Sequence, residues 1–439
     1  GTLEDHSRDI RRIRSVAAQL KRVVMVMIDL PGPKIRIGKL KDEPLILKKG
    51  DDVTLTTRET LGTPSRISVS YDRLPESVAK GSVIYLNDGF VQLKVQEVEE
   101  TEVRCMVVIG GPLISHKGLN LPTVNLMIDA VTERDLELVE FGLQEGVETY
   151  CISFVEKADD IVKVKEFARK RGTAVYVVAK IEREEAVRNI DEILEVADAV
   201  MVARGDLGVQ MPIEEVPAVQ KKLITKANLL GRPVITATQM LESMTENVRP
   251  TRAEATDVAN AILDGTDAVM LSEETAIGRY PVETVRMMAR IATSIERERK
   301  GVSPSSDLER YFKRGVDHKT VTIEDVVSLN VIETMRALPI RYILTPTHTG
   351  STPRRISRFK PDCWILSFSE YAATHEFMAL SYGVYPVLIE DGVENWQDVI
   401  IQFLRDAKLA KRNDRVILTE GVSTQQYVGT DSLKVITVV

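Results

Sequence analysis

The chain has 439 residues, of which 44% are hydrophobic and 28% charged, and its formal net charge is −7. That length allows two or three domains with buried cores. The acidic balance argues against a nucleic-acid-binding protein, and no apolar run approaches the roughly 18 to 20 residues of a membrane span. The three cysteines, Cys105, Cys151 and Cys363, are widely spaced. They predict reduced, mostly buried thiols in a cytoplasmic protein.

The chain begins with a helical pattern over residues 3–20, in which Ile10, Ile13, Val16 and Leu20 share one face. Apolar runs typical of strands follow, most of them separated by helical stretches. The runs are 23–28, 149–154, 175–181, 199–202, 233–236 and 268–271, and the helices are 157–171, 186–196, 213–230 and 251–263. Helices that alternate with strands apolar on both faces predict a parallel sheet covered by helices.

Residues 31–119 show a different pattern of short alternating strands bounded by turn residues. The strands are 52–56, 66–70, 82–86, 91–98 and 103–109. This pattern predicts an all-β domain inserted as a lid into the part of the chain that forms the parallel sheet. Residues 298–306 have the composition of a linker, and 307–439 predict a C-terminal α/β domain with a mainly parallel sheet. The domain with the parallel sheet then takes residues 1–30 and 120–297.

Six parallel strands are two short of a closed eight-stranded barrel. We therefore expect an α/β protein built on a (β/α)8 TIM barrel, with two further strand-bearing units before Gly1. An open six-stranded sheet is the alternative.

Chemically capable side chains follow the predicted strands. Lys180 and Glu182 are two apart, so in a strand they share a face and lie roughly 7 Å from each other. If the next strand is a parallel neighbour, Asp206 converges on them. Two carboxylates and an ammonium suit a divalent metal and a phosphate, which indicates phosphoryl transfer. The alternative is a plain strand-end ion pair, which is worth little when exposed.

The same arrangement recurs at the next two strands. Thr238 follows the run 233–236, and Ser272, Glu273 and Glu274 follow the run 268–271. A parallel α/β barrel places its active site at these strand ends.

With these segments in order, the sequence resembles the pyruvate kinase family over essentially its whole length. The matching segments are 27–29, 32–36, 86–89, 117–122, 180–182, 201–208, 237–244 and 250–254. The resemblance implies a barrel, an inserted β domain and a C-terminal α/β domain. It also implies that a segment before Gly1 carries a phosphate-binding arginine and two monovalent-cation ligands, without which we expect little or no activity.

The implied reaction is transfer of a phosphoryl group from phosphoenolpyruvate to ADP, giving ATP and pyruvate in the last step of glycolysis. By resemblance, Glu182 and Asp206 bind Mg²⁺ or Mn²⁺, and Lys180 contacts the transferred group. Gly205, Asp206 and Thr238 bind the substrate. A plain turn would explain Gly205 but not Asp206.

Protonation of the enolate is expected to use Thr238 with a water chain through Ser272 and Glu274. Alternatively, Thr238 has only a structural role, as a β-branched residue of a strand. Position 273 is glutamate where the family more often has glycine. For the nucleotide, the candidates are Arg36, Asp88 and Lys117, although Asp88 also fits a hairpin turn.

Potassium use is the main departure from the family pattern. The candidate positions for a monovalent cation or its substitute are Asp29, Leu30 and Lys34. Potassium-independent members resemble this chain in having lysine at the position of Lys34 and apolar residues at those of Leu30 and Ile37. The Lys34 ammonium can supply the charge that K⁺ would bring, so we expect no K⁺ requirement. A surface lysine on a loop is the alternative.

The C-terminal part resembles the effector-phosphate loop of the family at Thr347, Thr349, Gly350, Ser351 and Thr352, which would suit a sugar phosphate. The last loop, 420–430, lacks the usual proline and repeated glycines, so allosteric control stays open. Arg252 matches a subunit contact and implies a homotetramer.

Two other functions are alternatives to pyruvate kinase activity. A Mg²⁺-dependent pyruvate/phosphoenolpyruvate lyase would not need the β insertion or Lys117. A non-enzymatic metabolite-binding relative would not need the set formed by Lys180, Glu182, Asp206 and Thr238. We expect no nucleic-acid or membrane partner.

Overall fold

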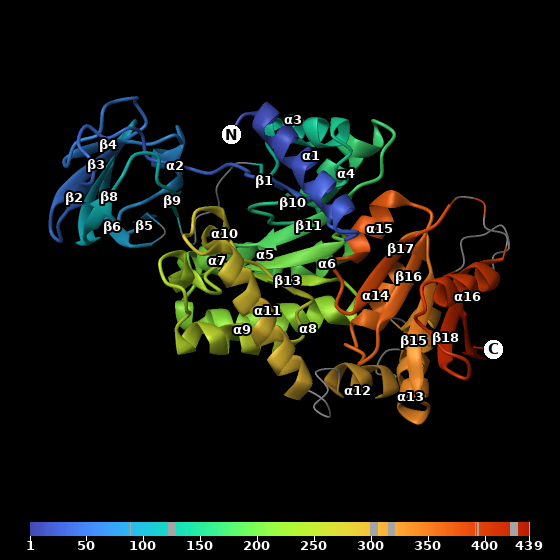
Figure 1. Cartoon of the computed structure of the whole chain (residues 1–439). Helices are drawn as coiled ribbons and strands as arrows, with labels where there is room; N and C mark the ends of the chain where they lie inside the picture. Colours follow the sequence, from blue (N-terminus) through green and yellow to red (C-terminus); the bar gives the residue numbers. More distant parts are fainter. Residues whose placement is uncertain are drawn as a thin grey trace.

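The computed structural model describes residues 1–87, 89–121, 129–298, 306–314, 321–390, 392, 395–421 and 429–438. Its central sheet has six parallel strands in the order β1-β10-β11-β12-β13-β14 (Figure 1). These strands are β1 (Ile28–Leu30), β10 (Thr149–Ile152), β11 (Tyr176–Ile181), β12 (Ala199–Ala203), β13 (Val234–Ala237) and β14 (Ala268–Val269). Each of the six predicted strands therefore has a counterpart in this sheet, although β1 shares only Ile28 with the predicted run 23–28.

Helices alternate with these strands. They are α1 (Leu3–Gln19), α3 (Glu133–Gln144), α4 (Ala158–Arg169), α5 (Glu184–Arg188), α6 (Ile190–Val196), α7 (Arg204–Gln210), α8 (Val216–Leu229), α9 (Arg252–Asp264), α10 (Glu273–Ala276) and α11 (Pro281–Glu298). Capping boxes fix several starts. In α9, for example, Thr251 accepts a hydrogen bond from the backbone of Glu254, whose carboxylate accepts one in return.

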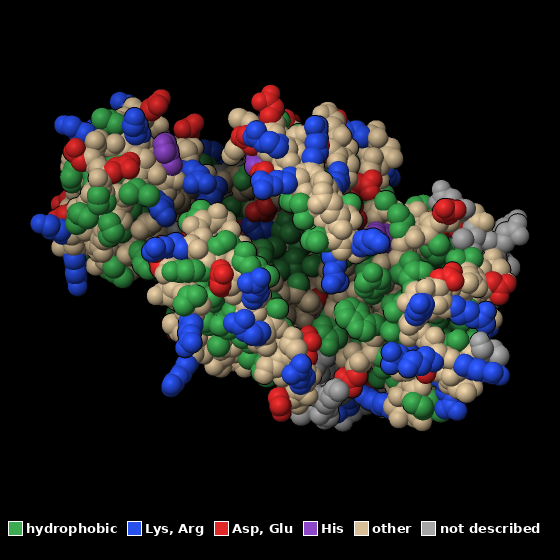
Figure 2. Space-filling view, in the orientation of Figure 1, with side chains coloured by type: hydrophobic (Ala, Val, Ile, Leu, Met, Phe, Trp, Pro, Cys, Tyr) green, Lys and Arg blue, Asp and Glu red, His purple; other side chains and the backbone are tan. Residues whose placement is uncertain are grey.

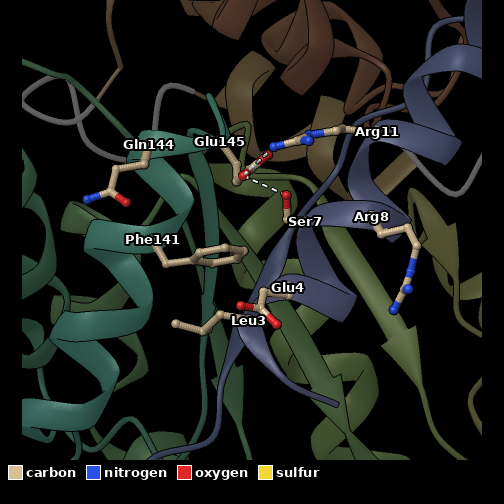
Figure 3. Close-up of a pocket in the computed structure, with 8 residues that line it drawn as sticks. All are labelled: Leu3, Glu4, Ser7, Arg8, Arg11, Phe141, Gln144 and Glu145. Carbon is tan, nitrogen blue, oxygen red and sulfur yellow. Dashed lines mark hydrogen bonds and ion pairs between the residues drawn. The ribbon is translucent and has the colours of Figure 1, made fainter.

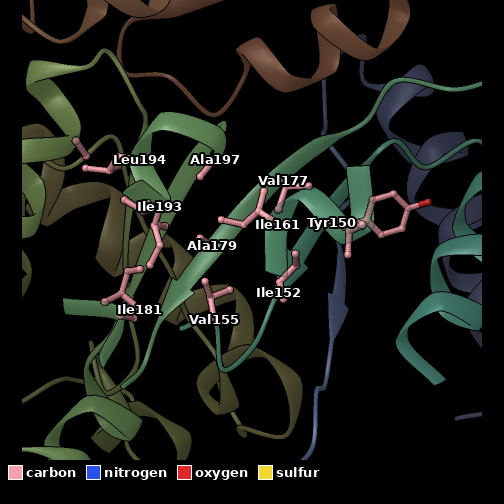
Figure 4. Packing of buried hydrophobic residues seen from close by; sticks show 14 of the residues in the cluster. Tyr150, Ile152, Val155, Ile161, Val177, Ala179, Ile181, Ile193, Leu194 and Ala197 are labelled. Carbon is pink, nitrogen blue, oxygen red and sulfur yellow. The ribbon is translucent and has the colours of Figure 1, made fainter. Parts of the chain in front are cut away.

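Alternation along β11 decides which side chains reach the site. Val177, Ala179 and Ile181 point outward into the core between sheet and helices (Figure 4). Successive strand residues point to opposite faces, so Lys180 lies on the other face, where Val178 packs with Met201 of β12 and Ile235 of β13.

A second, mainly antiparallel group of strands occupies the chain between β1 and β10 and lies to one side of the barrel (Figure 1). Its six-stranded sheet has the order β4-β3-β7-β6-β5-β9, and β2 pairs with β8. The elements are β2 (Leu45–Leu47), β3 (Asp52–Thr56), β4 (Arg66–Ser68), α2 (Leu74–Ser77), β5 (Val83–Leu86), β6 (Val91–Val98), β7 (Glu102–Ile109), β8 (Gly111–Leu113) and β9 (Leu119–Asn120).

The C-terminal sheet has the order β17-β16-β15-β18-β19, parallel except for the antiparallel β18–β19 pair. Its strands are β15 (Ile340–Pro346), β16 (Ile365–Ser369), β17 (Val384–Leu388), β18 (Arg415–Glu420) and β19 (Ser432–Thr437). The helices nearby are α12 (Ser306–Arg314), α13 (Ile323–Ala337), α14 (Ser351–Ser357), α15 (Ala372–Met378) and α16 (Trp396–Asp406).

Some predicted elements differ from the structure. The strand predicted over 23–28 begins only at Ile28, because the preceding residues have no paired neighbour in the described chain. The helix predicted over 186–196 is two helices that meet at Asn189, where the backbone leaves the helical conformation and the side chain donates to the carbonyl of Glu156. In α1 only Ile10 of the predicted stripe is buried, while Ile13, Val16 and Leu20 are exposed.

None of the helices in the described part of the chain combines the length and apolarity that a bilayer span requires. All three cysteines are free thiols, and Cys105 and Cys151 are buried, as predicted.

Candidate active site

The carboxyl ends of β1, β10 and β11 gather four polar side chains. The Nζ atom of Lys180 lies 2.9 Å from Oε1 of Glu182, 2.8 Å from Oγ of Ser153 and 3.4 Å from Oδ2 of Asp29. Ser153 is also 3.3 Å from Oδ1 of Asp29. Lys180 and Glu182 are thus ion-paired, and the cluster includes a serine and an aspartate from two other strand ends.

Burial and neighbouring charges act in opposite directions on Lys180. Burial alone lowers the pKa of the ammonium. Glu182 and Asp29 together raise it by more than burial lowers it, so the net pKa lies above its ordinary value. Lys180 therefore stays charged throughout the physiological range.

Glu182 is 1% exposed and receives a 2.9 Å hydrogen bond at Oε2 from the backbone N–H of Phe154. Burial raises the pKa of this carboxyl, Lys180 lowers it, and the second carboxylate, Asp206, raises it again, for a net increase. Asp206 is half-buried in the first turn of α7.

These two carboxylates fit a divalent metal. Burial and the second carboxylate disfavour the ionised form of Glu182, and a bound cation would stabilise it. Oxygen is the ligand that Mg²⁺ prefers. Within the described residues no three His, Cys, Asp or Glu side chains are grouped to hold a metal. A metal here would complete its coordination with substrate oxygens and water, which is the usual arrangement for Mg²⁺.

Thr238 lies in a turn directly after β13. Its φ angle is +69° and that of Gln239 is +52°. The Oγ1 atom of Thr238 accepts a 2.7 Å hydrogen bond from the backbone N–H of Gly205 and donates a 2.7 Å bond to the carbonyl of Ala237. Positive φ is an outlier for a β-branched residue, so surrounding contacts must hold this turn.

Glu274 connects the loops after β13 and β14. Its Oε1 accepts from the backbone N–H of Leu241 at 3.0 Å, and its Oε2 accepts from that of Ser272 at 2.7 Å. Glu274 is buried, Ser272 half-buried and Glu273 exposed. The structure therefore brings Ser272 and Glu274 together, with the carboxylate holding two backbone amides.

The residues predicted for the nucleotide lie where the β domain joins the barrel. The guanidinium of Arg36 donates to the carbonyl of His116 at 2.8 Å, and Arg36 pairs with Gly118, next to Lys117. Lys34 is exposed, and its Cε would be 3.6 Å from a Cβ built on Gly118. The basic residues 34, 36 and 117 are therefore neighbours.

Asp88 lies outside the described residues. The adjacent Gly89 would place a Cβ 3.5 Å from a methyl group of Val209, so this β-domain turn faces α7. Figure 2 shows a hollow between the β domain, on the left, and the barrel, with basic and acidic side chains at its rim. Of the other potassium-site positions, Leu30 is fully buried in the core, whereas Asp29 is largely exposed.

The predicted effector loop joins β15 to α14. Gly350 has φ +73°, and its N–H donates to the hydroxyl of Thr347 at 2.9 Å. The Thr352 hydroxyl bonds that of Thr430, and Ser351 accepts from Arg355 at 3.4 Å. Thr349 is exposed, residues 422–428 lie outside the described part, and Arg252 is exposed at the start of α9.

Sequence reasoning did not single out Ser153, Arg204 or Asp257. Ser153 belongs to the predicted run 149–154, so the rule that selected Thr238 could have selected it. Arg204 and Asp257 form an ion pair beside Thr238, and pairing between residues so far apart in sequence leaves no local signal.

A cavity of about 630 Å³ lies elsewhere, between α1 and α3 (Figure 3). Its lining includes Ser7, Arg11 and Glu145, which hydrogen-bond or pair with one another, and none of the predicted site residues.

Comparisons with known proteins agree with this geometry. Residues 1–285 match the family described as "Pyruvate kinase, barrel domain", and residues 325–436 match "Pyruvate kinase, alpha/beta domain". A pyruvate kinase of Thermococcus litoralis is 51% identical over 437 residues, covering 99% of this chain and 90% of that protein. One of Thermotoga maritima is 39% identical over 424 residues, covering 96% of this chain and 89% of that protein.

A crystal structure of a pyruvate kinase from Cryptosporidium parvum superposes with a TM-score of 0.90 at 32% identity. The match covers 100% of this chain and 89% of that one. The fold is thus that of a barrel domain with a C-terminal α/β domain, as predicted. The chain belongs to the pyruvate kinase family, a metal-dependent family of glycolytic phosphotransferases.

Proposed function

We propose that this chain catalyses the reaction of its family, phosphoryl transfer from phosphoenolpyruvate to ADP, which gives ATP and pyruvate in glycolysis. The observation that carries the proposal is the buried cluster of Lys180 with Glu182, beside Asp206, at the carboxyl ends of the parallel strands. Phosphoryl transfer depends mainly on positioning and on stabilising charge, which these groups provide.

Lys180 contacts the phosphoryl group as it moves. An ammonium at about 4 Å from a charged oxygen is worth up to ~4 kcal/mol at an effective dielectric constant near 20. Part of that energy is already present in the bound substrate, so the effect on the rate is smaller. Because Asp29 and Ser153 share Lys180 with Glu182, its position is fixed before substrate arrives.

Glu182 and Asp206 hold the divalent cation, Mg²⁺ or Mn²⁺. Such a cation supplies positive charge to the oxygens of the substrate. Backbone N–H groups at Gly205 and Asp206, in the first turn of α7, bind the substrate carboxylate together with the Thr238 hydroxyl. The hydroxyls of Thr238 and Ser272, together with water, relay a proton to the enolate. The carboxylate of Glu274 holds Ser272 in place by accepting a hydrogen bond from the backbone N–H of Ser272.

Arg36, Asp88 and Lys117 bind the nucleotide from the β domain, which closes over the site as a lid. Lys34 lies against the Lys117–Gly118 segment and supplies the charge that K⁺ provides in other members. We therefore propose that this enzyme works without K⁺, with Asp29 and Leu30 at the same site.

The whole protein has three domains: the barrel, residues 1–30 and 120–297, the β domain, residues 31–119, and the C-terminal domain, residues 307–439. It forms a cytoplasmic homotetramer, with Arg252 at a subunit contact. The loop formed by Thr347, Thr349, Gly350, Ser351 and Thr352 takes a sugar-phosphate effector, because its hydroxyls and backbone amides suit a phosphate.

The test is pyruvate formation from phosphoenolpyruvate and Mg²⁺ in a buffer free of K⁺, with and without ADP, and then with K⁺ added. We expect pyruvate only when ADP is present, and K⁺ should change the rate by less than twofold. Pyruvate without ADP would contradict the kinase assignment. A rate that rises more than tenfold with K⁺ would contradict only the proposed role of Lys34 and would leave the kinase assignment intact.

A further inference from the structure

Arg204 is the first residue of α7, next to the proposed substrate ligands Gly205 and Asp206, and its side chain is 13% exposed. Its Nη1 lies 2.7 Å from the carboxylate of Asp257 on α9. Its other nitrogens point at the turn after β13. Nε donates to the carbonyl of Ala237 at 3.2 Å, and Nη2 to that of Thr238 at 2.8 Å.

That turn needs an external support. Thr238 and Gln239 both have positive φ, a conformation that costs on the order of 1 to 3 kcal/mol for a residue other than glycine. It persists when the surrounding structure fixes the backbone, and two carbonyls of this turn are fixed by one guanidinium. Lysine could not replace these contacts, because a single ammonium lacks the flat fork of donors.

The turn is held through its side chain as well. The N–H of Gly205, the residue after Arg204, donates to Oγ1 of Thr238 at 2.7 Å. The first turn of α7 therefore binds both the backbone and the hydroxyl of Thr238. Since Asp206 is the next residue, this arrangement also sets where Thr238 lies relative to the carboxylate proposed to hold the metal.

We propose that Arg204, held by Asp257, is a positioning residue for the reaction, which fixes the strained Thr238 turn so that its hydroxyl faces the substrate. Arg204 acts through Thr238 and does not touch the substrate. The inference rests on the proposed function, because it needs Thr238 to bind phosphoenolpyruvate or to pass a proton.

The first experiment compares Arg204→Lys with Arg232→Lys. Arg232 is a matched control, because its guanidinium also donates to two carbonyls, those of Leu194 and Glu195, both at 3.1 Å, but before β13 rather than after it. We expect Arg204→Lys to lower kcat/KM for phosphoenolpyruvate at least tenfold, and Arg232→Lys to change it less than twofold. Equal losses in the two variants would overturn the proposal.

A double-mutant cycle separates positioning from general destabilisation. In a Thr238→Ala background there is no hydroxyl to aim, so Arg204→Lys should cost less than threefold instead of tenfold. The affinity for phosphoenolpyruvate with Mg²⁺, measured by calorimetry, provides the same cycle in variants too slow to assay. Equal costs of Arg204→Lys in both backgrounds would refute the positioning role.

The wild-type enzyme distinguishes this failure from failure of the proposed function. If wild type makes pyruvate from phosphoenolpyruvate and ADP while the cycle is additive, only the role of Arg204 is wrong. If Arg204→Lys does not fold, Asp257→Asn takes its place, since it keeps the side-chain shape and removes the charge that orients Arg204. We expect at least a threefold loss in Asp257→Asn, again suppressed by Thr238→Ala, and no suppression would refute the proposal.

Discussion

The ionisation of Lys180 depends on its neighbours more than on its own burial. Removing an ammonium from water favours the neutral amine, yet Glu182 and Asp29 restore the charged form and raise the pKa above its ordinary value. A charged lysine that already has two carboxylate partners can exchange one of them for a phosphoryl oxygen without a change in protonation. This favours electrostatic stabilisation over proton transfer as its role.

Replacing Lys180 with methionine should lower kcat by about 10²- to 10³-fold, because a charge worth up to ~4 kcal/mol corresponds to roughly three orders of magnitude in rate. The affinity for Mg²⁺ should not fall, since Glu182 and Asp206 remain. Steady-state kinetics and metal titration by calorimetry check both. A loss of less than tenfold in kcat would contradict the proposed contact with the transferred group.

Lys34 offers a reciprocal test of the potassium proposal. The glutamate of Lys34→Glu replaces the ammonium proposed to act in place of K⁺ with a negative charge. Lys34→Glu should therefore lower activity at least tenfold in K⁺-free buffer, and added K⁺ should restore part of it. Lys39→Glu, another exposed lysine of the β domain, is the charge-matched control and should show no K⁺ response. The same small loss in both variants, with no rescue, would show that Lys34 is an ordinary surface residue.

At the level of elements, the sequence predicted those whose signal is local. β11, apart from Lys180, and β12 are apolar runs, and their predicted limits agree with the structure to within one residue. By contrast, β14 has only two residues and β1 only three, because pairing with the neighbouring strand sets their length. The positive φ of Thr238 was not predictable, since it depends on Arg204, which comes from a different strand end.

The start of α13 combines a helix cap with ion pairs from another helix. Asp325 forms the capping box with Thr322. It also pairs with Arg355 of α14 and, at 2.8 Å, with Arg358, the residue that follows α14. Burial raises the pKa of Asp325, but Arg358, the cap and Arg355 lower it more, so the net pKa lies below its ordinary value of 3.8. The ionised form is therefore favoured in the folded state.

Asp325→Asn should destabilise the protein by about 3 kcal/mol at neutral pH, since it leaves the buried Arg358 without its anion. A carboxyl whose folded pKa is lowered contributes stability above its unfolded pKa and loses it as pH falls through the folded value. The difference in Tm from wild type should thus stay constant from pH 8 to 5 and shrink only below about 4. Thermal unfolding across this range measures it.

Asp5→Asn is the matched control, because it removes the same capping carboxylate from an exposed helix start in α1. It should leave Tm nearly unchanged. A difference for Asp325→Asn that already shrinks between pH 7 and 6 would mean that another titrating group accounts for the effect.

At the level of the whole molecule, the barrel and the C-terminal sheet are joined by a mixed interface. Tyr176, the first residue of β11, stacks on Phe377 of α15 at 4.1 Å between ring centroids, and its hydroxyl lies 2.7 Å from that of Thr374. Thr374 in turn donates to the carbonyl of His348 in the proposed effector loop. The strand that carries Lys180 near its carboxyl end therefore begins against the C-terminal part, so the two regions should unfold as one unit.

The buried pair of Asp267 and Lys360 crosses the same interface and provides the means to test that cooperativity. Their charged atoms are 2.7 Å apart, and the same oxygen of Asp267 accepts from the backbone N–H of Tyr382 at 3.0 Å. Lys360→Met keeps the length of the side chain but leaves a buried carboxylate without its cation. Breaking such a buried pair costs about 3 to 5 kcal/mol. Because the pair joins the two regions, this free energy is lost from the contact between them.

Calorimetry of Lys360→Met should therefore show two separated unfolding transitions where wild type shows one. Lys226→Met is the control, because Lys226 pairs with the exposed Asp191 on the barrel surface and such a pair is worth about 1 kcal/mol or less. A single transition for Lys360→Met, shifted no more than that of Lys226→Met, would mean that the aromatic stack couples the two regions more strongly than the ion pair does. In that case Tyr176→Leu, which removes the stack and the hydroxyl together, should produce the separation instead.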